Sequence, residues 1–233
     1  MYRKGAWRKS GATGAQARGI LMKITVFGAT GGIGGLVVTQ ALDAGHKVTA
    51  VVRDSADFGL AHPALEVVTV PGLTDPEPLL PALEASEAVI SGVGPRSRKD
   101  GPVASSTAGG ILAAMAASGV RRLVAVSAAP VGPVPAGDSF ANRRILLPIV
   151  TALLRDTYAD LAAMEDEIRR SATDWTVVRP PRLVNKPLTG AYRTCVGGNV
   201  ARGSTISRAD VAHLMLAVLD DPATIRQAVG IAY

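Results

Sequence analysis

Three glycines at fixed spacing, Gly28-x-x-Gly31-x-x-Gly34, are the residues of this chain with the clearest chemical meaning. The apolar, β-branched run 23–27 precedes them, and a helical pattern follows at once. In such a strand–turn–helix unit the first glycine permits the tight turn. The second lets the backbone approach a pyrophosphate, and the third lets the helix pack close to the sheet. The free N–H groups and the positive dipole end of the helix then face the phosphates. The pattern therefore predicts a dinucleotide-binding unit.

The chain carries an internal control for this interpretation. Residues 11–14 repeat the tetrapeptide at 28–31, Gly-Ala-Thr-Gly. The earlier copy follows only Arg8, Lys9 and Ser10, and no amphipathic helix comes after it. We interpret the copy at 11–14 as a coincidence, because a glycine motif is informative only between a strand and a helix.

The strand after the glycine turn ends in Val52-Arg53-Asp54, which bears on the choice of nucleotide. An NAD site usually places a carboxylate here for the ribose hydroxyls, whereas NADP requires a cation for its 2′-phosphate. Arg53 can stack on the adenine and bind that phosphate, with Asp54 turned to solvent. We therefore expect NADPH to be preferred; the alternative for Arg53 is an exposed loop cation.

The acid–base pair of most short-chain dehydrogenases is missing. In their Tyr-x-x-x-Lys pair the lysine lowers the tyrosine pKa for proton transfer to a carbonyl or alcohol. No lysine lies between Lys99 and Lys186, and Tyr158 is followed four positions later by Ala162. These facts argue against an ordinary alcohol dehydrogenase or a sugar-nucleotide epimerase.

Hydrophobic periodicity predicts alternating strands and helices. Nearly all-apolar strands of this kind indicate a doubly wound parallel sheet covered on both faces, in a single-domain α/β Rossmann fold. Beyond Pro181 a smaller segment is expected to close over the carboxyl ends of the strands, where open α/β sheets bind ligands. Within it, Ser207 and Asp210 are expected to cap a helix that runs to about Leu219. The predicted strands are 23–27, 47–52, 65–70, 88–91, 122–127, 175–179, 192–196 and 204–206, and the predicted helices include 76–85 and a stretch from about 142 to 171.

Charge and composition limit the remaining functions. The 233 residues are 48% hydrophobic and 19% charged, which is typical of a globular domain. Five basic residues and no acid lie in residues 1–21, so the formal net charge of +6 belongs mainly to this segment. We expect 1–21 to be a disordered basic extension and 22–233 to be the NAD(P)-binding domain. Nucleic-acid binding through the tail is a third, weaker hypothesis.

No metal is expected, and the compartment expected is the cytoplasm. The single cysteine, Cys195, excludes an intrachain disulfide and a cysteine-rich metal site, which suits a reducing environment. The three histidines show no ligand-like spacing, and no apolar run is long enough to span a membrane.

On these residues the chain resembles the atypical short-chain dehydrogenase/reductases, the NAD(P)H-binding family, and within it the flavin reductase/biliverdin-IXβ reductase type. The similarity runs from residue 22 to about 220. The residues that carry it are Phe27–Gly31, Val52–Asp54, Gly92–Gly94, Leu123–Ser127, Arg179–Pro181, Pro187–Tyr192 and Ile206–Asp210.

The resemblance implies a role for each part of the site. One NAD(P)-binding fold would hold the substrate on the nicotinamide in a shallow pocket. The pyrophosphate would be bound by Gly28, Thr30, Gly31, Gly32 and Ile33. Arg53 would bind the 2′-phosphate, Val93 and Gly94 the adenosine side, and Val126, Ser127, Pro181, Arg182 and Leu183 would flank the nicotinamide.

Two departures from that type concern catalysis. Arg182 stands where the flavin/biliverdin reductase has a histidine, and an arginine does not donate a proton near neutral pH. It can instead bind an anionic group of the substrate or stabilise an anionic product, or it can pair with Glu165 or Asp166. Ala128 replaces a pocket serine and leaves Ser127, whose alternative role is a backbone-bonding hydroxyl. Tyr192 is expected to pack with its hydroxyl at the surface.

The leading hypothesis is an NADPH-dependent oxidoreductase that passes hydride to a flavin, a quinone or a similar planar acceptor. Ser127 and Arg182 are its candidate catalytic residues, and a monomer or weak dimer without nucleic-acid or membrane partners is expected. The second hypothesis is a non-catalytic NAD(P)-sensing protein of the nitrogen-metabolite repressor-like type.

Overall fold

The computed structural model describes residues 20–53, 58–94, 101–135, 137–138 and 152–233. The main sheet has eight strands in the order β3-β2-β1-β4-β5-β6-β10-β8. All neighbours are parallel except β8 and β10, and the first six strands follow the doubly wound order 3-2-1-4-5-6. The strands are β1 (Lys23–Phe27), β2 (Lys47–Val52), β3 (Leu65–Thr69), β4 (Ala88–Ser91), β5 (Arg122–Val126), β6 (Asp174–Arg179), β7 (Arg182–Val184), β8 (Arg193–Val196), β9 (Thr205–Ser207) and β10 (Gln227–Ala232).

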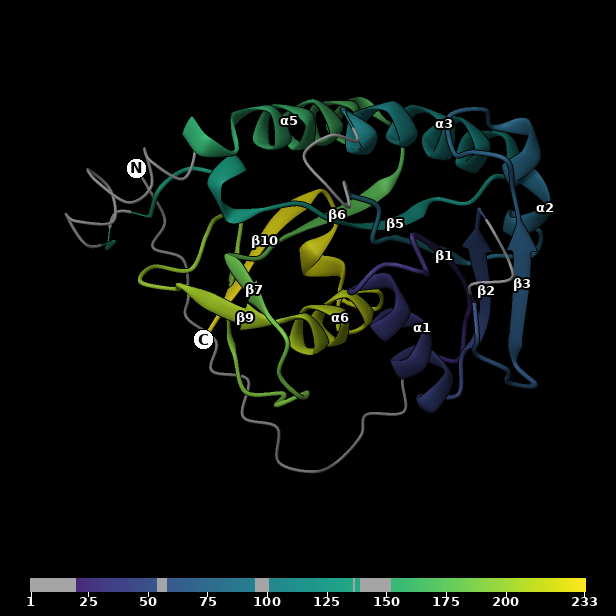
Figure 1. Cartoon of the computed structure of the whole chain (residues 1–233), viewed down its shortest axis with the longest axis horizontal. Helices are drawn as coiled ribbons and strands as arrows, with labels where there is room; N and C mark the ends of the chain where they lie inside the picture. Colours follow the sequence, from purple (N-terminus) through teal and green to yellow (C-terminus); the bar gives the residue numbers. More distant parts are fainter. Residues whose placement is uncertain (1–19, 54–57, 95–100, 136, 139–151) are drawn as a thin grey trace.

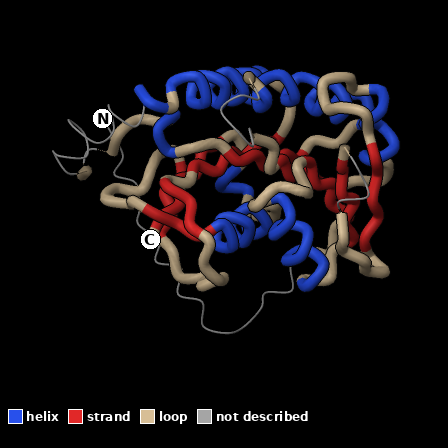
Figure 2. Tube along the Cα trace, viewed as in Figure 1, coloured by secondary structure: helices blue, strands red, loops and turns tan. Residues whose placement is uncertain are grey.

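Helices cover both faces of the sheet (Figures 1 and 2). The α-helices of the described residues are α1 (Gly34–Asp43), α2 (Leu80–Leu83), α3 (Val103–Ser118), α5 (Arg155–Arg170) and α6 (Arg208–Ala217). One buried apolar cluster packs α1 and α6 against one face, and a second packs α2, α3 and α5 against the other. The central strands are buried on both faces and are therefore almost wholly apolar.

A buried arginine ties α6 to the sheet. Arg122, at the start of β5, donates from Nε to the carbonyl of Leu219 (3.1 Å) and from Nη2 to the carbonyl of Val218. It also donates to the hydroxyl of Thr176 on β6 (2.9 Å). Burial lowers the pKa of its guanidinium. These bonds satisfy carbonyls that the end of α6 leaves unpaired, and so hold the helix in place.

Two strands were not predicted, and one predicted helix is interrupted. β10 lies between β6 and β8, and β7 pairs with β9. The predicted helix at 76–85 is a 3₁₀ turn (Glu77–Leu79) followed by the short α2. Pro78 and Pro81 have no N–H to donate, which prevents one continuous helix.

Part of the sequence prediction lies outside the described residues. This applies to residues 1–19 of the predicted extension, to Asp54, and to 139–151, which include the start of the helix predicted from about 142 to 171. Within the described ranges, no helix has the length and apolarity needed to cross a bilayer.

Gly34→Ala is expected to lower the free energy of unfolding by about 1–3 kcal/mol, because overpacking forces the backbone to shift. A Cβ on Gly34 would lie 2.1 Å from the carbonyl oxygen of Gly28. The measurement is the urea midpoint at unchanged m value. Gly72→Ala is the control, since a Cβ there meets nothing within 4 Å. Equal midpoints for the two variants would contradict the close approach.

Candidate functional site

A cavity of about 1040 Å³ lies at the carboxyl edge of the main sheet. Its walls are the turn after β1, the ends of β4 and β5, the segment after β7 and the start of α6. Open α/β sheets bind ligands at this edge, where the strand order reverses between β1 and β4. The lining residues are Thr30, Gly31, Gly32, Ile33, Leu36, Gln40, Asp43, Gly92, Val93, Gly94, Val126, Ser127, Leu161, Leu183, Asn185, Lys186, Pro187, Leu188, Arg208 and Ala209.

The glycine turn presents bare backbone to this cavity. Gly28 has a φ of +75°, and a Cβ there would lie 2.8 Å from the carbonyl carbon of Gly92. The N–H of Gly31 donates to the carbonyl of Gly28 (2.9 Å), which closes the turn. The N-cap residue of α1, Ile33, makes no side-chain cap bond, and the first turn contains no acid. The turn therefore fits a diphosphate, which takes the place of a cap at a helix N-terminus.

Most of the predicted site residues meet in this cavity, although their roles toward a ligand stay predictions. Gly28 does not line the cavity, but its positive φ and its bond to Gly31 form the turn. Arg53 is exposed just after β2, and neither it nor Pro181 and Arg182 is among the lining residues. Those that line the cavity are Thr30, Gly31, Gly32, Ile33, Val93, Gly94, Val126, Ser127 and Leu183.

Ser127 brings a buried hydroxyl to the cavity at the end of β5. The residue is 7% exposed, and its Oγ is buried with no hydrogen-bond partner among the described residues. Its backbone N–H donates to the carbonyl of Val178 (2.8 Å), so the main chain is fixed while the hydroxyl is not engaged by the backbone. A buried hydroxyl without a partner is unfavourable, so a ligand group is a natural partner for it.

Asp210 ties the two motifs of the C-terminal segment together. Its carboxylate is fully buried and accepts from the N–H groups of Thr189 (3.0 Å) and Gly190 (2.8 Å). It also accepts from the hydroxyls of Thr189, Ser207 and Tyr233 (3.0, 2.8 and 2.6 Å). Burial alone would raise its pKa, but the bonds from Tyr233, Ser207, Thr189 and Gly190 prevail and the pKa lies below its ordinary value. The carboxylate thus fixes 187–190, whose first residues form a cavity wall.

The predicted cap at Ser207 is present in altered form. The Ser207 Oγ accepts from the N–H of Asp210 (2.9 Å), as expected. The reciprocal bond differs, because the N–H of Ser207 donates to the hydroxyl of Tyr233 (3.2 Å) instead of to the short Asp210 side chain.

Tyr192 packs against the buried core as expected, but its hydroxyl is hydrogen-bonded to a neighbouring side chain rather than left at the surface. It lies 2.6 Å from Nδ1 of His213 on α6. Burial and the charge of Asp210 raise the tyrosine pKa. Tyr192 thus packs the segment after β7 onto α6.

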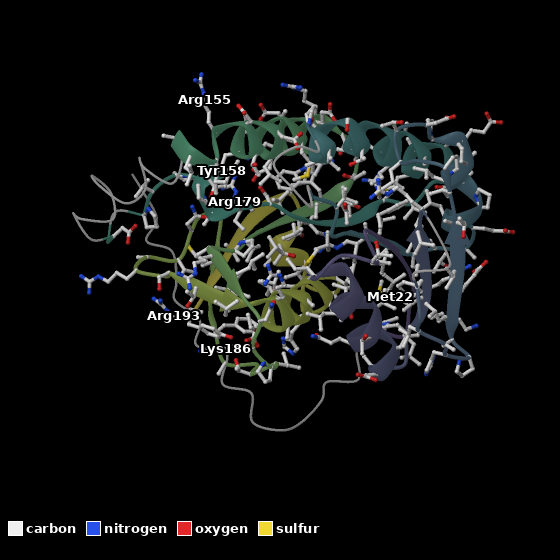
Figure 3. All side chains as sticks on the ribbon, viewed as in Figure 1. Met22, Arg155, Tyr158, Arg179, Lys186 and Arg193 are labelled. Carbon is white, nitrogen blue, oxygen red and sulfur yellow. The ribbon has the colours of Figure 1, made fainter. Side chains whose placement is uncertain are left out.

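The arginine that pairs with Glu165 is Arg179, whereas the sequence had offered Arg182 as a possible partner of Glu165 or Asp166. The carboxylate of Glu165 is fully buried and accepts from Arg179 Nε (2.9 Å) and Nη2, and from Arg169. Asp166 pairs with Arg169 (2.8 Å). Figure 3 shows Arg179 beneath α5 and Lys186 on the other side of the sheet, near β9 and α6. Arg182 is exposed and forms no ion pair within the described part of the chain.

Sequence reasoning missed several lining side chains. Leu36, Gln40 and Asp43 line the cavity from α1, and Arg208 reaches the glycine turn from α6. Pro187, Leu188 and Arg208 stood within motifs that carried the family resemblance, so their presence there was a usable signal. No sequence signal marked Asn185 or Gln40, since their position depends on how α1 packs against α6.

Fold and site together define an NAD(P)-binding Rossmann protein. The sequence profile of the family described as NAD(P)H-binding matches residues 28–222. The chain belongs to that family.

Solved structures support the same fold. A short-chain dehydrogenase/reductase from Veillonella parvula in complex with NADP matches with a TM-score of 0.74 at 20% identity, over 91% of this chain and 94% of that one. The anaerobilin reductase ChuY from Escherichia coli O157:H7 matches at 0.73 and 21% identity, over 90% and 96%. A Burkholderia pseudomallei protein described as exported matches at 0.76 and 25% identity, over 91% and 100%.

Asp210→Asn is expected to lower the free energy of unfolding by about 3 kcal/mol at pH 7, because it removes a charge that five donors stabilise. The folded pKa is depressed, so the stabilisation is complete above the ordinary aspartate value of about 3.9 and is lost as the pH falls toward the folded value. Urea unfolding of both proteins from pH 7 to pH 3 measures this difference. If the difference in the free energy of unfolding between wild type and variant does not narrow at acid pH, the stabilisation by the Asp210 charge is contradicted.

Proposed function

We propose that this protein is an NADPH-dependent reductase that passes hydride to a planar conjugated acceptor such as a flavin or a quinone. One observation carries the proposal: a single cavity connects the glycine turn with the buried, unpartnered hydroxyl of Ser127. A dinucleotide with its diphosphate at the turn has room to extend its nicotinamide toward the end of β5. The single cysteine and the family suit a cytoplasmic enzyme.

The backbone and apolar side chains of the site bind and orient the cofactor. Gly32 and Ile33 would offer main-chain N–H groups to the diphosphate, while Gly31, whose own N–H closes the turn, and Thr30 lie beside it. Val93 and Gly94 would border the adenosine side, and Val126 and Leu183 the nicotinamide, whereas Pro181, also expected there, is not among the lining residues. When bound, the reduced nicotinamide supplies the hydride.

The residues that face the acceptor then have one main task, which is to orient the acceptor against the nicotinamide. A planar conjugated acceptor takes a hydride into its ring system, and the accompanying proton comes from water, so no Tyr–Lys pair is required. The hydroxyl of Ser127 offers a hydrogen bond that orients the acceptor ring. Arg182 does not line the cavity, but it is exposed and outside the Glu165 ion-pair cluster, so its guanidinium remains available for an anionic group of the acceptor or of the product.

A non-catalytic NAD(P) sensor is the second candidate. The observation that favours it is the lining itself: among the described residues, the cavity wall contains no tyrosine, histidine or cysteine. This candidate predicts nucleotide binding, a protein partner and no turnover.

The purified chain is expected to oxidise NADPH with at least one acceptor from a panel of FMN, FAD, a soluble quinone and biliverdin. The measurement is the loss of the absorbance of the reduced nicotinamide.

Ser127→Ala should lower kcat/KM about tenfold and leave the NADPH Kd unchanged, because one neutral hydrogen bond to the acceptor is lost. Ser106→Ala, on the exposed face of α3, is the control. NADPH binding without turnover on any acceptor would remove the reductase and favour the sensor.

Arg53→Ala is expected to raise the Kd for NADPH about 10- to 100-fold while changing that for NADH less than about threefold, because a guanidinium bound to the 2′-phosphate serves NADPH alone. Lys47→Ala is the control, since Lys47 is also exposed but lies at the opposite end of β2. Calorimetric titration of each variant with both nucleotides measures the effect. Equal losses for the two nucleotides would exclude the 2′-phosphate role.

A further inference from the structure

Arg208 is a cation on the cavity wall that lies directly against the glycine turn. It is the first residue of α6. A Cβ built on Gly32 would lie 3.1 Å from its Cδ and 3.2 Å from its Nε. The side chain therefore occupies the space that the absent side chain of Gly32 leaves open. Gly32 thus permits a close approach to a second element as well as to a ligand.

One contact holds the guanidinium of Arg208, and two others hold the helix end that carries it. Its Nη1 donates to Oδ1 of Asn185 (2.6 Å), in the segment after β7. The Nε2 of Gln40 on α1 donates to the carbonyl of Ala209 (3.0 Å), which links the start of α6 to α1. Ser207 caps the same helix end. Asn185 thus orients the guanidinium, while Gln40 and the Ser207 cap fix the backbone that carries it.

Most of its donors are still available. A guanidinium has five N–H groups. Within the described part of the chain, Asn185 is the acceptor that the Arg208 side chain bonds. A group with this many donors at a helix N-terminus suits a phosphate, which accepts bidentate bonds from arginine.

The charges around the cavity also favour an anion at the turn. Arg208 and Lys186 are the basic lining residues, and Asp43 is the acidic one. Asp43 ends α1, nine residues after Gly34, which is about 13 Å along the helix axis at about 1.5 Å per residue. The charge of Arg208 therefore lies against the turn, next to the positive end of the α1 dipole, while the acidic residue lies at the far end of the helix.

We propose that Arg208 binds the diphosphate of the dinucleotide, so that the cradle consists of the amides of the glycine turn and this guanidinium, with Asn185 as its positioning residue. The proposal rests on the proposed function only in requiring that the chain binds a nicotinamide dinucleotide. Because the diphosphate is common to both nucleotides, Arg208 serves NADPH and NADH alike. Arg53, by contrast, reads the 2′-phosphate of NADPH.

The test compares three ligands by calorimetric titration of the full chain: NADPH, NADH and adenosine 2′-monophosphate, which has no diphosphate. Arg208→Gln should raise the Kd for NADPH and NADH by the same factor, about 10- to 100-fold, and change that for adenosine 2′-monophosphate less than about twofold. Arg208→Lys should recover part of the loss, since lysine keeps the charge but not the planar fork. Asn185→Ala should weaken both dinucleotides by about two- to fivefold, because it loosens the guanidinium without removing it.

Arg121→Gln is the matched control, because Arg121 is an exposed arginine at the opposite edge of the sheet, beside Asp174. It should leave all three constants unchanged, and an unfolding midpoint of Arg208→Gln close to that of this control shows that the fold is intact. An unchanged Kd for both dinucleotides, or a loss confined to NADPH, overturns the role of Arg208. If Arg208→Gln does not fold, the Asn185→Ala constants decide the matter, and unchanged values overturn it.

The outcome is separable from that of the proposed function. If the wild-type chain binds dinucleotides and Arg208→Gln binds them equally well, only the role of Arg208 fails. If the chain binds them and never turns over an acceptor, the reductase fails while the diphosphate cradle stands.

Discussion

The approach of α1 to β1 and β4 without intervening side-chain carbon is the constraint on which the rest of the structure depends. Gly34 lies against the carbonyl of Gly28, and Gly28 against the backbone of Gly92. A methyl group at any of these positions would separate the helix from the sheet. Because the contact is made by backbone alone, the helix end keeps its N–H groups free of bulk at the point where the strand order reverses. Packing and anion binding are thus two consequences of one geometry.

A second constraint acts through a charge. Isolated in the interior, the carboxylate of Asp210 would be costly, so its stability depends on the donors gathered around it. Those donors come from the segment after β7, from the cap of α6 and from Tyr233. The carboxylate therefore makes an otherwise irregular segment into one wall of the cavity. It also fixes the helix end that carries Arg208, so this side of the cavity rests on buried interactions.

The sequence was most informative where a short local pattern decides the structure. Strands at 23–27, 47–52 and 88–91 were predicted with the observed bounds, because runs of apolar residues buried on both faces leave few alternatives. The strand β10 was missed because its alanines and glycine carry little β preference. It becomes a strand through pairing with β6 and β8, which lie far away in the sequence.

In the site, too, features set by a local pattern could be predicted and features set by distant contacts could not. The glycine turn could be predicted because backbone geometry demands glycine there. The ion pair of Glu165 could not be assigned from sequence, since Arg179 and Arg182 stand three residues apart and only the fold directs the first beneath α5. Gln40 and Asn185 reach the cavity through the packing of α1 on α6 and the fixing of the segment after β7. No local pattern marks either of them.

The dependence of the glycine turn on backbone geometry, rather than on particular side chains, explains why the fold persists while sequences diverge. The Veillonella, Escherichia and Burkholderia structures share 20 to 25% identity with this chain and superpose with TM-scores of 0.73 to 0.76. A cofactor cradle made from main-chain amides needs only a few glycines, so it tolerates replacement nearly everywhere else. In the proposed reductase the acceptor side is different, because side chains such as Ser127 and Arg182 and the segment after β7 would give it its character. In the proposed reductase, a change of acceptor therefore requires substitutions in those side chains and none in the turn that holds the cofactor.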